Sequence, residues 1–177
     1  MIDVREYARA LFLVGEEDGD TEDVLAQLKI IEGLIKKEPG YVTLLDTPAV
    51  SKAEKLALID EAFGSLNKNL LNFIKILSER HHVYALTKIL AEYSALYDEA
   101  RGIVRVDAVT ALELSKDQKT TLKKKLEGML SKTVIINNIV DPSVLGGVKL
   151  RYSGIQVDGT VKARIDGFAA RLKDLVV

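Results

Sequence analysis

The stretch VDPSVLGGVKLRYSGIQVDGTVKARI, residues 140–165, carries the residue types that most suggest chemistry. The pair Gly146-Gly147 and the later pair Asp158-Gly159 are typical of turns that bring backbone N–H groups close to a phosphate. A P-loop, however, requires G-x-x-x-x-G-K-[ST] before a helix, and here the paired glycines lead through a valine to Lys149 inside an expected strand. We therefore expect the glycines to form a turn beside a sheet, where they permit a close backbone approach.

The sequence contains few residues that could form a nucleophilic catalytic site or a metal site. The chain has no cysteine, and its only histidines are the neighbours His81 and His82. Neighbouring residues on a helix point about 100° apart, so these two rings cannot easily share one metal ion. A Ser-His-Asp or Cys-His arrangement is close to excluded. We expect no catalytic, metal or cofactor site, and a solvated or capping role for both histidines at a helix junction.

The acidic run EEDGDTED, residues 16–23, suggests a calcium loop. If the loop began at Asp18, its sixth position would be Asp23 where glycine is needed, and its twelfth would be Lys29 where glutamate is needed. The calcium interpretation fails, and a solvated loop is the better prediction.

The cluster Lys123-Lys124-Lys125 could contact nucleic acid. On a helix these side chains take three successive directions, so one must lie near the apolar stripe of Leu122, Leu126 and Met129. Few aromatic residues accompany the cluster, and no RNA-binding motif is present. A solvated helix face is the commoner meaning of such a run.

Composition is that of an ordinary globular protein. Of 177 residues, 47% are hydrophobic and 29% charged, and no apolar run approaches the roughly 18 residues that span a bilayer. Charges interrupt the N-terminal segment, which is therefore unlike a secretory signal. Residues 1–102 hold 12 Lys/Arg and 18 Asp/Glu, whereas residues 103–177 hold 13 and 8. This opposite balance favours two domains with different partners.

The first 102 residues predict an antiparallel helical bundle. Apolar residues recur at helical spacing in five segments, with room for a short sixth helix between Pro39 and Pro48. Ser51 with Glu54 forms a capping box. The segment NKNLLNFIKILSER, residues 67–80, carries apolar side chains around most of its circumference, which predicts a helix near the middle of the bundle.

Residues 103–177 predict a small α+β domain. IVRVDAVTA and TVIINNIV are rich in β-branched residues, which favours strands. Ser115 with Gln118 caps a lysine-rich helix between them. VKLRY and IQV then form a hairpin through a turn at Ser153-Gly154, and Thr160 caps a last helix.

The stretch quoted first resembles the C-terminal signature of the delta subunits of F-type ATP synthases, the family that includes the oligomycin-sensitivity-conferring protein. The resemblance rests on Asp141, Gly146, Gly147, Arg151, Asp158, Gly159 and Arg164, together with YARALF, residues 7–12. It extends over essentially the whole chain.

This resemblance implies a non-catalytic stator subunit with two ends. A six-helix N-terminal domain, residues 1–102, would bind N-terminal segments of the alpha subunits at the top of the catalytic head. Its groove, between the first and fifth helices, would contain Tyr7, Ala10, Leu11, Val14, Phe73, Ile76 and Leu77. The alternative for Leu11, Phe73 and Leu77 is plain core packing, because apolar faces inside helical bundles look alike. An α+β domain, residues 103–177, would join the b subunits of the peripheral stalk and keep the head from turning with the rotor.

The resemblance also implies a peripheral location on the cytoplasmic side of the cell membrane, as part of the ATP synthase complex. Relatives from organelles carry targeting extensions, so the sequence favours a bacterial subunit or a mature form without its extension. The alternative function is a basic nucleic-acid-binding protein that acts through its C-terminal half.

Overall fold

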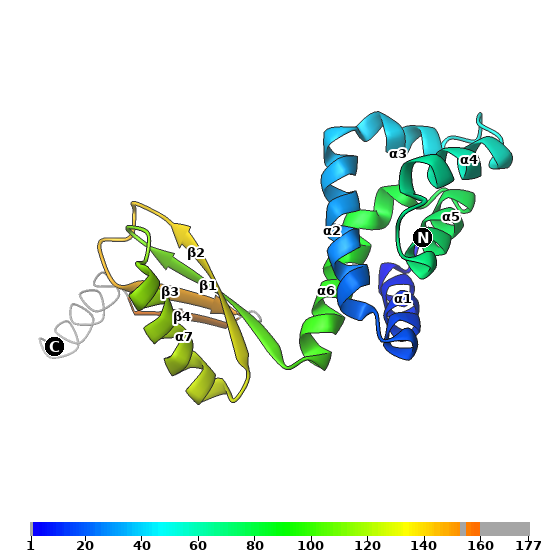
Figure 1. Ribbon diagram of the computed structural model, residues 1–177. Helices are drawn as coiled ribbons and strands as arrows, with labels where there is room; N and C mark the ends of the chain where they lie inside the picture. The colour runs from blue at the N-terminus through cyan, green and yellow to red at the C-terminus, as the bar shows by residue number, and fades with distance from the viewer. Residues whose placement is uncertain (1, 153–154, 160–177) are drawn as a thin grey trace, which may run out of the picture. The chain divides into compact units, whose positions relative to one another are not determined.

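The chain divides into two compact units, Met1–Ala100 (unit 1) and Arg101–Val177 (unit 2). The computed structural model describes residues 2–152 and 155–159 of them. Within these residues, unit 1 consists of six α-helices and a short 3-10 helix, and unit 2 holds one α-helix and a four-stranded sheet (Figure 1). The predicted order, a helical part followed by an α+β part, is confirmed.

The elements of unit 1 follow one another through short connections. They are α1 (Val4–Asp18), α2 (Thr21–Lys37), α3 (Pro39–Asp46), α4 (Lys52–Phe63), α5 (Lys68–Glu79), the 3-10 helix η1 (Val83–Ala85) and α6 (Leu86–Ala100). Side-chain caps explain where three of them begin. Asp3 accepts from two backbone N–H groups of α1, Asn67 does so in α5, and the predicted capping box of Ser51 and Glu54 opens α4.

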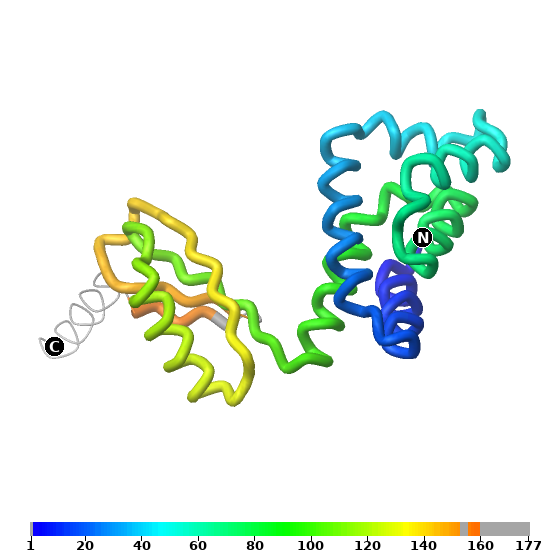
Figure 2. Tube along the Cα trace, viewed as in Figure 1, coloured from blue at the N-terminus to red at the C-terminus, as the bar shows by residue number. Residues whose placement is uncertain are grey.

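The last helix of unit 1 lies against the first two, so segments far apart in sequence share one core (Figure 2). Tyr93 of α6 is fully buried, stacks edge-on against Phe12, and donates its hydroxyl to the carbonyl of Thr21 at 3.2 Å. A Cβ at Gly15 would lie only 3.2 Å from that hydroxyl, so glycine allows α1 to approach α6 closely.

Helix α5 is buried on one side, where it contacts α1, α3 and α4, and not on all sides as a helix at the middle of the bundle would be. It buries Leu70, Phe73, Ile74, Leu77 and Ser78, while Lys68, Asn72, Ile76 and Glu79 are exposed. The count of apolar residues overstated the buried face because Ile76 points outward and the half-buried Leu71 lies at its edge. One side of α5 is therefore open at the surface of unit 1.

The acidic run at residues 16–23 does not form the predicted solvated loop. Helix α1 continues through Asp18, and Gly19 in the left-handed conformation turns the chain into α2. Oδ2 of Asp18 accepts from the side-chain amide of Asn69 at 2.6 Å, and Asp20 likewise accepts from Asn67. The acidic side chains thus fix the α1–α2 corner to the start of α5.

Unit 2 is built on a mixed sheet. Its elements are β1 (Ile103–Thr110), α7 (Lys116–Leu130), β2 (Thr133–Val140), β3 (Val148–Tyr152) and β4 (Ile155–Asp158), and the strand order is β2-β1-β3-β4. Strands β1 and β2 are parallel and are joined through α7, whereas β3 and β4 form the predicted antiparallel hairpin. The expected turn at Ser153-Gly154 and the expected helix from Thr160 lie outside the described residues.

Helix α7 packs against β2, and Figure 1 shows it over one face of the sheet. The predicted capping box of Ser115 and Gln118 starts it. Asn138 of β2 faces inward and is fully used, because it accepts from the N–H of Leu114 and donates to Ala108 and Thr110. This network ties the start of α7 to the two central strands.

The apolar stripe of α7 differs from the prediction. Leu122, Leu126 and Leu130 are half-buried, but Met129 is 80% exposed because it lies roughly a quarter turn from Leu130. The three lysines of the cluster, residues 123–125, are exposed, and Lys125 lines a shallow pocket together with Leu122, as expected for the lysine that lies near the stripe. Lys123 forms an ion pair of 3.7 Å with Glu127.

Candidate partner-binding surface

Helices α1 and α5 lie next to each other and run in opposite directions. At one end, the ring of Tyr7 meets Phe73 edge-on with centroids 6.2 Å apart and also meets His82, just beyond α5. At the other end, the side chain of Asp18 binds Asn69. These contacts align the two helices along nearly their whole lengths.

The structure divides the seven predicted groove residues into two groups. Three lie in the core, with exposed fractions of 0% to 8%: Leu11, Phe73 and Leu77. The other four reach the surface: Tyr7 is half-buried, Ala10 is exposed, and the exposed fractions of Val14 and Ile76 are 40% and 47%. The buried three can shape the floor between the helices, but Leu77 has no exposed surface with which to touch a partner.

We call the surface formed by Tyr7, Ala10, Val14 and Ile76 the α1/α5 face. Its α1 members are spaced three and four residues apart and therefore form one line along that helix. Alanine in the middle of the line leaves room for the backbone of a guest helix, and valine and isoleucine offer apolar contact. Such a face suits an amphipathic helix that presents an apolar stripe.

A row of aromatic rings stands at the Tyr7 end of this face. The ring of His82 lies 6.0 Å from Tyr7 and 6.1 Å from Tyr84, both edge-on, and Tyr84 is 61% exposed. The Asp46 carboxylate holds this corner in place by accepting from the N–H groups of Val83 and Tyr84. Sequence reasoning missed His82 and Tyr84 because their position beside Tyr7 depends on the turn after α5.

Leu13 is a further residue that sequence reasoning missed. It lies on α1 and is 52% exposed. The sequence did contain a signal for its exposure, because Leu13 falls outside the helical stripe of Val4, Ala8 and Leu11 that faces the core. Apolar residues outside a buried stripe are candidates for contact with partners.

The signature residues of unit 2 shape the turn before β3. Gly146 and Gly147 have φ values of 133° and 84°, in the region that favours glycine, and lead directly into β3. The predicted turn beside a sheet is confirmed. Asp141 begins the same loop: its carboxylate accepts from the N–H of Ser143 at 2.9 Å, and its own N–H donates to Thr110.

The remaining signature residues lie around the hairpin. Arg151 stands opposite Asp107 of β1 and Gln156 of β4. Asp158 is the last residue of β4, and the N–H of Gly159 donates to the carbonyl of Val148 at 3.0 Å. A Cβ on Gly159 would lie 3.1 Å from that oxygen, so glycine allows the close approach. Arg164 lies outside the described residues.

Hydrogen bonds from the hydroxyl and the N–H of Ser143 lower the pKa of Asp141, with help from the charges of Lys149 and Arg151. A lowered pKa in the folded state means that the charged carboxylate stabilises the turn above about pH 4, and that this contribution fades as the pH falls. Ser143→Ala removes the largest cause and should move the pKa part of the way up. Side-chain carboxyl NMR titration of both proteins measures this, and an equal or lower pKa in the variant would contradict it.

Among residues 2–152 and 155–159, no group of three or more His, Cys, Asp or Glu side chains is placed to hold a metal ion. In the same part of the chain no helix is long and apolar enough to cross a membrane. The surfaces, rather than a reactive centre, are the features to compare with other proteins.

A protein-family model described as the ATP synthase delta (OSCP) subunit matches residues 4–172. The chain belongs to this family. The "ATP synthase subunit delta" of Clostridioides difficile (strain 630) is 33% identical over 172 residues, which cover 96% of this chain and 95% of that protein. The subunit of the same name from Priestia megaterium (strain ATCC 12872 / QMB1551) is 30% identical over 163 residues, with coverage of 92% and 90%.

A solved structure agrees on the fold. A chain of the Toxoplasma gondii mitochondrial ATP synthase hexamer matches with a TM-score of 0.72 at 20% identity, over 97% of this chain and 98% of that one. As a member of the delta (OSCP) family, the chain is a non-catalytic, structural subunit of an F-type ATP synthase, with a stator role in the complex. The nucleic-acid alternative has no comparable support.

Proposed function

We propose that this delta-family subunit connects the alpha subunits of the catalytic head to the b subunits of the peripheral stalk. In this arrangement the complex places the subunit on the cytoplasmic side of the membrane. Torque from the rotor acts on the head, and a tether at its top opposes rotation of the head as a whole. Two interfaces that dissociate slowly would meet that need.

The two units would serve as the two ends of the tether. Residues 1–102 would act as a six-helix bundle and residues 103–177 as the stalk-binding domain, with the change at Arg101-Gly102, where Gly102 has a φ of 61°. The opposite charge balance of the two parts supports separate partners. A basic second part suits an acidic helical partner.

The α1/α5 face carries the proposal for the head. It exposes the apolar side chains of Val14 and Ile76 around the small Ala10. Exposure of these side chains to water does not stabilise unit 1 by itself. An amphipathic helix from an alpha-subunit N-terminus would cover them and place its own apolar residues against Tyr7. The buried Leu11, Phe73 and Leu77 would support this surface from beneath.

The test is calorimetric titration of the full chain with a synthetic peptide of the alpha-subunit N-terminus from the same organism. We expect saturable one-to-one binding at or below micromolar concentrations and a negative heat-capacity change, which reports burial of apolar surface. A peptide with the same composition in scrambled order serves as the control. No binding, or equal binding of the scrambled peptide, would contradict the proposal.

A further inference from the structure

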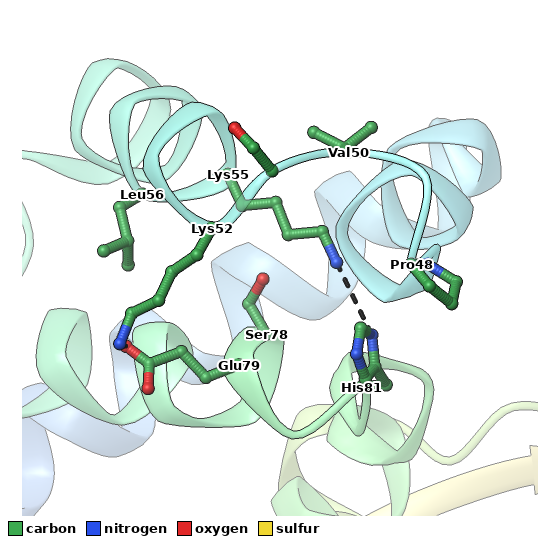
Figure 3. Close-up of a pocket in the computed structure, with 9 residues that line it drawn as sticks. Pro48, Val50, Lys52, Lys55, Leu56, Ser78, Glu79 and His81 are labelled. Atoms are coloured by element: carbon green, nitrogen blue, oxygen red, sulfur yellow. Dashed lines mark hydrogen bonds and ion pairs between the residues drawn. The ribbon is translucent and has the colours of Figure 1, made fainter.

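Unit 1 contains a cavity that shares no residue with the α1/α5 face. It has a volume of about 340 Å³ and lies between the α3–α4 loop, the start of α4 and the end of α5. Figure 3 shows the side chains of Lys52 and Lys55 reaching into it from α4, opposite Glu79 and His81. Neither the family assignment nor the proposed tether gives this cavity a role.

Lys55 is the unusual residue of the cavity. It is only 4% exposed, although a charged ammonium is costly to bury without a partner of opposite charge. Within the described part of the chain, its Nζ has a single contact, with Nδ1 of His81 at 3.5 Å. The carboxylate of Glu79, which also lines the cavity, pairs with Lys52 at 3.0 Å.

The contact with His81 does not satisfy Lys55. Nδ1 of His81 lies 2.7 Å from the backbone carbonyl oxygen of Asp46. A carbonyl oxygen only accepts, so Nδ1 carries the proton and donates it to Asp46. It then has no lone pair for the ammonium of Lys55, and two donors face each other. The buried cation therefore lacks an acceptor among the residues described.

The surroundings of Lys55 favour an anion. The cavity lies at the N-terminus of α4, where the helix dipole is positive. The capping box uses the N–H groups of Ser51 and Glu54, which leaves those of Lys52 and Ala53 without an intrahelical partner. Among the described residues, the ammonium of Lys52 pairs with Glu79 alone, and because Lys52 is largely exposed it can turn toward a stronger acceptor.

We propose that this cavity binds a compact oxyanion of the phosphate class, held by the Lys55 ammonium and the N-terminal end of α4, with Lys52 at the rim. The oxygens of such an ion supply the acceptors that Lys55 lacks. The helix N-terminus adds backbone donors and a favourable dipole. A free ion fits this small cavity better than a partner helix does, because two lysines line it and the apolar α1/α5 face lies elsewhere.

The test is an NMR titration of the full chain with sodium phosphate, compared with sodium chloride at matched ionic strength and pH. We expect saturable shifts of the His81 ring and of the Lys52 and Ala53 amides with phosphate only. Lys55→Met, which removes the charge and keeps an unbranched side chain one atom shorter, should weaken phosphate binding about tenfold or more. Lys88→Met, an exposed position on α6, is the matched control and should bind as the unaltered chain does.

The titration of the unaltered chain tests phosphate binding even if Lys55→Met folds poorly. Shifts that never saturate, or that chloride reproduces at the same ionic strength, would overturn the proposal. A well-folded Lys55→Met that binds phosphate with unchanged affinity would overturn it as well. The outcome is independent of peptide binding, since the two sites share no residue.

Discussion

Ile76→Asp is expected to weaken binding of the alpha-subunit peptide by about a hundredfold, or about 2.7 kcal/mol, while unit 1 stays folded. Ile76 is 47% exposed in the free protein, so the carboxylate can remain in water there and costs little stability. In the complex the guest helix would cover it, and the charge would be buried without a partner. Calorimetric titration measures the affinity, and circular dichroism checks the fold.

The matched control for this variant is Ile30→Asp. Ile30 is 60% exposed on α2 and is not part of the α1/α5 face. It introduces the same charge into the same unit, so any general effect of the substitution will appear in both proteins. We expect the control to bind with the affinity of the unaltered chain. If the two variants lose affinity equally, the α1/α5 face is not the binding surface.

Leu77→Ala is expected to destabilise unit 1 by about 3 kcal/mol, within the usual range of roughly 2 to 5 kcal/mol for truncation of a buried leucine. Leu77 is fully buried in the core, and its removal leaves a cavity beneath the α1/α5 face. The adjacent Ile76→Ala should cost less than about 1 kcal/mol, because its side chain is already half in water.

Denaturant unfolding followed by circular dichroism at a helical wavelength measures both variants, since most of the described helix lies in unit 1. Peptide affinity is then measured under conditions in which each variant is fully folded. Similar stability losses for the two substitutions would show that Ile76 belongs to the core and that the face has been placed wrongly. Direct loss of binding by Leu77→Ala without loss of stability would count against its buried position.

Sequence reasoning succeeded where the signal is local. The capping boxes at Ser51 and Ser115 each depend on residues three positions apart, and both are present. The strands were predicted from their β-branched residues, and the hairpin of β3 and β4 from its short connection. In each case neighbouring residues carry the information, so no knowledge of the tertiary packing was needed.

Sequence reasoning was weaker where tertiary packing determines which side chains are buried. Leu77 and Ile76 are adjacent apolar residues of α5, yet one is fully buried and the other is half exposed. The difference depends on which side of α5 the rest of the unit covers. The bonds of Asp18 and Asp20 to asparagines about 50 positions away likewise have no local signature.

The paired glycines of the C-terminal stretch suggested a phosphate site in the sequence, but in the structure they form a turn. Gly146 and Gly147 could have formed a phosphate loop, but they precede a strand rather than a helix. The site that does have the character of an anion cavity lies in unit 1, around Lys55. No motif marks it, because Lys55 becomes buried beside His81 only once α3, α4 and α5 are packed together.

The central claim is that the α1/α5 face receives the alpha-subunit peptide, and methyl NMR of the full chain during a peptide titration tests it most directly. We predict that the methyl signals of Val14 and Ile76 shift and saturate together, while those of Ile135 and Ile139 in unit 2 do not move. Saturable binding that leaves the Val14 and Ile76 methyls unchanged would contradict the claim and place the head-binding surface elsewhere on the chain.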